Sequence, residues 1–248
     1  MRLAEATTTE AAATETSLAL LPVGSTEQHG PHLPLGTDCM TASAVAEAAA
    51  DAYGDEVVLA PTVPIGVAEE HRAFSGTLWV SPDTFRSYVR ETVASLAYHG
   101  WDRVVVVNGH GGNVRALGEV CELISRHDAA YAVAFTWFEA VDDHTSEMGH
   151  GGPLETALVR HSDPELVREG RVEEARAGAA DRWGEWVSTV NLAVDSAEFT
   201  ENGVVGDPTE GSAERGEELE ALAASALVRL LEAIEGRDPS DLDGGRSV

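Results

Sequence analysis

The chain has 248 residues and a formal net charge of −27, from 43 acidic residues against 16 basic residues that are all arginine. This composition argues against a nucleic-acid-binding surface and against a site for an anionic membrane, because both need a basic footprint. The absence of lysine also excludes a Schiff base or a nucleophile formed by a lysine side chain.

The predicted elements alternate in chain order between short apolar runs and helical patterns. Residues 1–16 are rich in Ala, Thr and Glu and are expected to be flexible. Strands are then expected at 17–23, 56–60, 103–107 and 130–137, and helices at 41–53, 81–99, 114–127, 153–161 and 212–236. The four consecutive valines in 103–107 indicate a strand that is buried on both faces. The alternation predicts an α/β fold, with a mostly parallel central sheet between two layers of helices.

No internal repeat or linker divides the chain. We expect a single domain over 17–236, followed by a polar, glycine-rich and disordered tail over 237–248. No stretch approaches the roughly 18 consecutive apolar residues of a membrane span. The first residues lack the pattern of a signal peptide, so a cytoplasmic protein is expected. Segment 178–201 has no clear pattern.

The loop after the first strand concentrates side chains that bind metals. It runs from Gly24 to Asp38 and contains Glu27 and His29. In parallel sheets, ligands bind beyond the carboxyl ends of the strands, where this loop lies. Glutamate, histidine and aspartate suit zinc, manganese or iron. The alternative is a loop whose polar groups cap neighbouring backbone, but the density of ligand types favours a metal site.

A second candidate ligand, His110, lies in the glycine-rich turn 108–113 that follows the valine strand. We expect it at the same edge of the sheet as the first loop. The turn has an alternative role as a phosphate cradle at a helix N-terminus. It lacks the lysine and the spacing of a P-loop, although both roles are compatible.

Two further segments carry candidate residues. His150 and Glu155 could face a shared pocket, but Glu155 has the alternative role of a first-turn acid favoured by the helix dipole. His144 precedes them. His71, in segment 66–77, could belong to the same site or to a solvated loop.

Five motifs resemble the creatininase family in their order and spacing. They are PVGSTEQHGPHLPLGTD, EEHRAFSGT, VVVNGHGGN, HGGPLET and GVVGDPTEGS, between about Leu18 and Ser212. The resemblance implies a three-layer α/β/α fold, assembly into hexamers and two bound divalent metal ions (zinc, iron or manganese). It also implies hydrolysis of a small-molecule amide by a metal-bound hydroxide.

The resemblance implies a role for each candidate site residue. Glu27 and His29 would bind different metals, Asp38 would bridge them and His110 would complete the first site. His150 and Glu155 would be catalytic, beside the substrate and the water.

One departure from the family pattern concerns the second metal. Creatininase has a glutamate ligand two residues after the equivalent of His110, where this chain has Gly112. We therefore expect a second metal that is held more weakly or is absent. Creatinine amidohydrolase activity becomes a less favoured alternative.

With glycine at position 112, the chain resembles two other branches of the family. One is the archaeal deformylase of 2-amino-5-formylamino-6-ribosylaminopyrimidin-4(3H)-one 5'-phosphate, on the route to riboflavin and the deazaflavin cofactor. The other is the peptidase that trims the mycofactocin precursor. The lysine-free, acidic composition suggests a halophilic archaeon and so favours the deformylase. A metal-binding protein without turnover and a nucleotide-binding module are the alternatives that are not enzymes.

Overall fold

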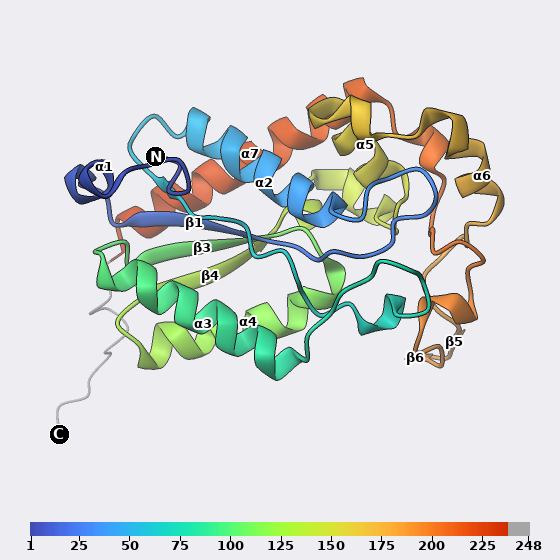
Figure 1. Ribbon diagram of the computed structural model, residues 1–248, viewed down its shortest axis with the longest axis horizontal. Helices are drawn as coiled ribbons and strands as arrows, with labels where there is room; N and C mark the ends of the chain where they lie inside the picture. Colours follow the sequence, from blue (N-terminus) through green and yellow to red (C-terminus); the bar gives the residue numbers. More distant parts are fainter. Residues whose placement is uncertain (238–248) are drawn as a thin grey trace.

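The computed structural model describes residues 1–237, and its centre is a parallel sheet with strand order β2-β1-β3-β4. The strands are β1 (Leu18–Val23), β2 (Val58–Leu59), β3 (Arg103–Asn108) and β4 (Tyr131–Thr136). Figure 1 shows helices on both faces of this sheet. The structure confirms the predicted three-layer α/β/α fold. The predicted tail lies, apart from Arg237, outside the described residues.

The helices divide between the two faces of the sheet (Figure 1). One face is covered by α3 (Pro82–Tyr98) and α4 (Val114–His127). The other is covered by α2 (Thr37–Ala52), α5 (Pro153–Ser162) and α7 (Ala213–Glu235). The shorter α6 (Val172–Ala177) follows α5. Short 3₁₀ helices lie at Glu69–His71, Gly111–Asn113, Trp137–Glu139, Asp142–Glu147, Pro164–Leu166, Glu169–Arg171, Ser196–Glu198 and Pro208–Glu210.

Alternate residues of the strands supply the two cores. Leu18 and Leu20 of β1 pack toward α2 and α7, whereas Leu21 and Val23 pack toward α3 and α4. This follows from the two-residue period of a strand, whose successive side chains point to opposite faces. Each fully buried leucine contributes about 1.5–3 kcal/mol through the removal of apolar surface from water. The two cores hold the carboxyl ends of the strands, and therefore the following loops, in a fixed position.

Helix α2 begins earlier than its sequence pattern indicates. The expected start was Thr41, but the helix begins at Thr37. Asp38 therefore lies in the first turn of α2, where the helix dipole favours a carboxylate, and not in the loop before it. By contrast, α3 begins as predicted, because the Ser81 side chain accepts a hydrogen bond from the backbone N–H of Thr84.

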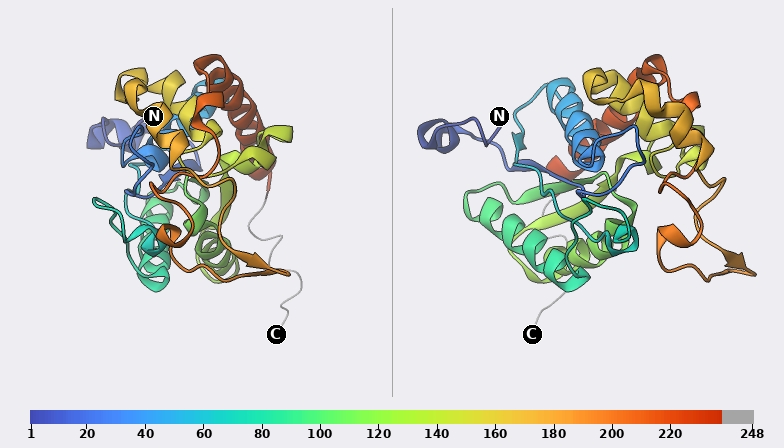
Figure 2. Two further views of the ribbon diagram at one scale, coloured as in Figure 1. Left: turned by 90° about the vertical axis from the view of Figure 1, so that its right-hand side faces the viewer. Right: turned by 45° about the vertical axis from the view of Figure 1, so that its right-hand side comes forward.

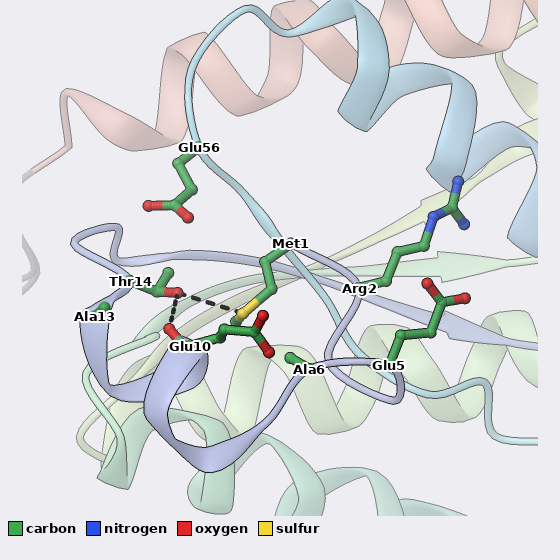
Figure 3. Close-up of a pocket in the computed structure, with 8 residues that line it drawn as sticks. All are labelled: Met1, Arg2, Glu5, Ala6, Glu10, Ala13, Thr14 and Glu56. Atoms are coloured by element: carbon green, nitrogen blue, oxygen red, sulfur yellow. Dashed lines mark hydrogen bonds between the residues drawn. The ribbon is translucent and has the colours of Figure 1, made fainter.

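The N-terminal segment, which we expected to be flexible, forms backbone hydrogen bonds with the edge strand of the sheet. The backbone of Leu59 in β2 donates to Met1 O at 2.8 Å and accepts from the N–H of Leu3 at 2.9 Å, so the first residues lie along the edge of the sheet. Helix α1 (Thr8–Ala13) follows and has a complete capping box. A pocket of about 440 Å³ lies beside this segment (Figure 3) and contains none of the candidate ligands.

Segment 178–201 contains a short antiparallel hairpin, β5 (Trp186–Val187) and β6 (Val190–Asn191). Figure 2 shows this hairpin projecting from one end of the molecule. None of the helices within residues 1–237 is both long and apolar enough to cross a membrane.

Candidate metal centre

Two loops that are distant in sequence meet beyond the sheet. Strands β1 and β3 are parallel neighbours whose last paired residues are Val23 and Asn108, so both following loops start at the same edge. The β3 loop packs on the first turn of α2. A Cβ atom at Gly109 would lie 2.1 Å from the backbone oxygen of Asp38, so this close approach requires glycine. The predicted meeting of the two loops is confirmed.

The first cluster consists of Glu27, Asp38 and His110, which are all buried. His110 Nδ1 lies 3.1 Å from Glu27 Oε1 and 3.4 Å from Asp38 Oδ2. One ligand atom from each of the three residues lies within 4.8 Å of the other two. Three buried ligands of this kind can hold one divalent cation.

The second cluster consists of His29, His150 and Glu155, which are also buried. His29 Nε2 lies 3.6 Å from Glu155 Oε1 and 3.0 Å from Asp38 Oδ1. Oδ2 of Asp38 thus faces the first cluster, and Oδ1 faces the second. The structure brings together all six residues that the sequence identified as ligands or catalytic groups.

Backbone carbonyl groups fix the tautomers of three histidines in the clusters. The three hydrogen bonds join His29 Nδ1 to Glu27 O (3.1 Å), His110 Nε2 to Val67 O (2.7 Å) and His150 Nε2 to Gln28 O (2.5 Å). Because a carbonyl oxygen can only accept, each of these nitrogens carries a proton. In the neutral form of each ring, the opposite nitrogen presents its lone pair to the carboxylates. Histidine ligands of metals are oriented in this way.

Several polar atoms in the clusters have no hydrogen-bond partner. They are both carboxylate oxygens of Glu27, Oδ2 of Asp38 and Nε2 of His29. A buried polar atom without a partner costs about 1–3 kcal/mol, and more when it is charged. Divalent cations would satisfy the carboxylate oxygens and the histidine lone pairs together. The donor set therefore fits two metal ions.

The clustered charges shift the pKa values of their members. Burial raises the pKa of Glu27 to about 7, against the opposing effect of His110. Burial disfavours the charged forms of His110 and His29, but neighbouring carboxylates outweigh it. They raise the pKa of His110 to about 10 and that of His29 well above its ordinary value. Without a metal, both histidines therefore hold protons at neutral pH.

This protonation predicts a pH-dependent affinity for metal. An ion must displace the protons of His29 and His110, so affinity is low where both are protonated and rises until the pH passes their pKa values, which for His110 is about 10. We expect the affinity for Zn²⁺ to increase about tenfold or more per pH unit between roughly pH 6 and pH 8. Competition with a chelator, corrected for the protonation of the chelator, measures this. An affinity that does not change with pH would refute the proton displacement.

His71 also lies in the site, whereas His144 does not. The Nε2 atom of His71 is 3.5 Å from Glu27 Oε1, and its ring stacks on that of His150 with centroids 4.2 Å apart. Burial lowers the pKa of His71 well below its ordinary value, so the ring is neutral. His144 instead accepts from the Arg215 guanidinium at 3.2 Å, away from both clusters.

A pocket of about 340 Å³ opens onto the clusters. Its lining residues are Glu70, His71, His110, Gly111, Gly112, Phe138, Met148, Gly149, His150, Glu155 and Trp183. Trp183 has its ring edge-on to His71, with centroids 5.5 Å apart. The sequence did not identify Trp183 as a site residue, since it belongs to the segment that gave no clear pattern.

The space beside Gly112 explains why this position carries no ligand. A Cβ atom there would lie 2.2 Å from the backbone oxygen of Val67 and 2.7 Å from Glu70 Oε1. A glutamate at this position would therefore need the backbone to move. Glu155, 3.6 Å from His29 Nε2, still supplies a carboxylate to the second cluster.

The turn 108–113 uses its own polar groups to hold His110. Asn108 Oδ1 accepts from the His110 N–H at 3.1 Å, and Asn108 Nδ2 donates to His110 O at 2.8 Å. The Asn113 N–H donates to the same carbonyl at 3.2 Å. With two of its N–H groups used internally, this turn favours the ligand role over the phosphate cradle. His32 similarly bonds to Thr156 Oγ1 at 2.9 Å, next to Glu155.

Comparison with known proteins extends over most of the chain. The family model described as creatininase, creatinine amidohydrolase, matches residues 4–231. A mycofactocin precursor peptide peptidase of Mycobacterium ulcerans is 37% identical over 206 residues, which cover 79% of this chain and 77% of that protein. A solved creatinine amidohydrolase has a TM-score of 0.80 at 23% identity, with 96% and 98% of the two chains covered. A structure named "Creatininase Mn" has a TM-score of 0.80 at 22% identity, with 95% and 99% covered.

Proposed function

The chain belongs to the creatininase family of amidohydrolases, and on this premise we propose that it hydrolyses a C–N amide bond with two divalent metal ions in its clusters. The convergence of histidine lone pairs on unpartnered carboxylate oxygens carries this proposal. Glu27, Asp38 and His110 would hold one ion, and His29 and Asp38 the other. Zinc, manganese and iron all suit these ligands.

Divalent ions at such a site supply a water nucleophile of lowered pKa and polarise the carbonyl of the substrate. Glu155 and His150 are the proton-transfer groups in our proposal. Burial and the nearby His29 lower the pKa of His150 to about 3, so the ring is neutral and its Nδ1 presents a lone pair. Glu155 is ionised, since His29 outweighs the effect of burial and lowers its pKa. Either group can then pass the proton to the leaving nitrogen.

The pocket lining favours a substrate without a phosphate group. Within residues 1–237 it includes no arginine, and it includes the carboxylates of Glu70 and Glu155. A phosphate ester would find no guanidinium among these lining residues. Phe138, Met148 and Trp183 provide an apolar wall. These features support a peptide-like amide, in keeping with the name of the 37% identical relative.

Deformylation of the formylamino-pyrimidine nucleotide is the second candidate. The lysine-free, acidic composition favours it, because this composition suits a halophilic archaeon. The lack of an arginine in the pocket lining within residues 1–237 disfavours it, since that substrate carries a phosphate. Gly112 does not separate the two candidates, because both branches resemble this chain at that position.

The candidates can be separated with one panel of substrates. Metal-loaded protein would be incubated with the mycofactocin precursor peptide, the formylamino-pyrimidine nucleotide, creatinine and a simple formamide. We expect cleavage of the peptide, and formate release from the nucleotide at less than about a tenth of that rate, a difference of about 1.4 kcal/mol, because the described pocket lining offers the phosphate no arginine. Formate release from the nucleotide without peptide cleavage would reverse our order of preference.

A further inference from the structure

The side chain of Gln28 fixes the proton of His71. Gln28 Oε1 accepts from the N–H of Gly30 at 3.0 Å, and Gln28 Nε2 donates to Gly203 O at 3.1 Å. These two bonds define which end of the amide is nitrogen. The same Nε2 lies 2.8 Å from His71 Nδ1 and has one hydrogen left to donate. His71 Nδ1 is therefore an acceptor.

The neighbouring hydroxyl group is compatible with this assignment. Ser196 Oγ lies 3.0 Å from both His71 Nδ1 and the backbone oxygen of Glu70, and its hydrogen can be donated to either. A proton on Nδ1 would instead place two N–H groups face to face at the 2.8 Å separation from Gln28. The neutral ring of His71 thus carries its proton on Nε2.

The tautomer of His71 differs from those of His110 and His150 in the group that it presents to Glu27. Three imidazole nitrogens surround Glu27 Oε1: His110 Nδ1 at 3.1 Å, His71 Nε2 at 3.5 Å and His150 Nδ1 at 3.7 Å. In the neutral form that binds an ion, His110 and His150 present lone pairs to this oxygen, because their other ring nitrogens donate to backbone carbonyls. The neutral ring of His71 presents an N–H to the same oxygen.

We propose that His71 is a positioning residue, whose fixed N–H faces Glu27 Oε1 at 3.5 Å and orients this carboxylate for the first metal ion by electrostatic attraction, and that His71 does not bind an ion itself. This inference rests on the proposed metal-dependent function. To bind an ion, His71 would have to use Nε2, which carries the proton. Moving this proton to Nδ1 would require the Gln28 amide to turn over and to break its bonds to Gly30 and Gly203. The stacking of His71 on His150, at an interplanar angle of 21°, also restrains the ring.

Two substitutions test the role of the N–H. In His71→Gln the amide nitrogen can lie near the original Nε2 position, whereas in His71→Asn it lies nearer Nδ1. We expect His71→Asn to lower the affinity for Zn²⁺ about 10- to 100-fold, as the loss of a partner behind a metal ligand does, and His71→Gln to restore most of it. Gln28→Glu should resemble His71→Asn, because a carboxylate at this place moves the proton to Nδ1. Chelator competition gives the affinities without an activity assay.

The outcomes distinguish this inference from the proposed function. Wild-type affinity in His71→Asn, or equal losses in His71→Asn and His71→Gln, would overturn the role of His71. Wild-type protein that binds no metal would overturn the proposed function itself. If the variants fail to fold, ¹⁵N NMR of the wild-type imidazoles decides the matter. We expect a proton on Nε2 of His71, and a proton on Nδ1 would refute the inference.

Discussion

Asp38→Ala is expected to abolish hydrolysis and to lower the metal content of the protein. Asp38 faces both clusters, with Oδ1 3.0 Å from His29 Nε2 and Oδ2 3.4 Å from His110 Nδ1. Its loss removes the shared ligand and leaves neighbouring histidine lone pairs without a cation between them. We expect kcat/KM to fall about a thousandfold or more, which corresponds to about 4 kcal/mol of transition-state stabilisation. Elemental analysis after dialysis would show the accompanying loss of metal.

A matched control separates this effect from the stability of helix α2. Asp83 also lies in the first turn of a helix, but its side chain is 91% exposed and far from the metal ligands in sequence. Asp83→Ala removes a comparable favourable interaction with a helix dipole, typically about 0.3–1 kcal/mol, and should keep full metal content and turnover. Asp38 is not a bridging ligand if Asp38→Ala behaves like this control.

Glu155→Gln should slow turnover about 10²- to 10⁴-fold while metal remains bound, as expected for loss of a proton-transfer group. The substitution keeps the shape of the side chain and an oxygen that can accept from the Gly151 N–H, as Glu155 Oε2 does. It removes the negative charge 3.6 Å from His29 Nε2. Turnover and metal content would be measured on the same preparation.

The metal content of this variant decides between two roles for Glu155. Loss of one ion per chain would make Glu155 a ligand that takes the place of the carboxylate missing at Gly112. Unchanged turnover would exclude both roles. The first cluster, which consists of Glu27, Asp38 and His110, should retain its ion in either case.

The parts of the site that follow strands could be predicted from the sequence. Strand patterns place the loops after β1 and β3 at one edge of a parallel sheet, and this was enough to bring Glu27, His29 and His110 together. The roles assigned to these residues come from the family resemblance and stay predictions. Assembly into a hexamer also stays a prediction.

Contacts between distant irregular segments could not be predicted. Gln28 meets Gly203 across 175 residues and His71 meets Ser196 across 125, and neither pair lies in a strand or helix pattern with a defined register. For the same reason, the sequence left His71 undecided and did not place Trp183 in the pocket. The flexible start was expected from composition, which does not reveal that Met1 and Leu3 hydrogen-bond to Leu59 at the sheet edge.

The most direct test is to measure metal content and amide hydrolysis on one preparation before and after chelation. We expect bound zinc, manganese or iron in a stoichiometric amount, up to two ions per chain. Chelation should remove the metal and abolish hydrolysis, and adding the ion back should restore both. Full hydrolysis by protein from which all metal has been removed would contradict the proposal that these buried clusters form a metal-dependent active site.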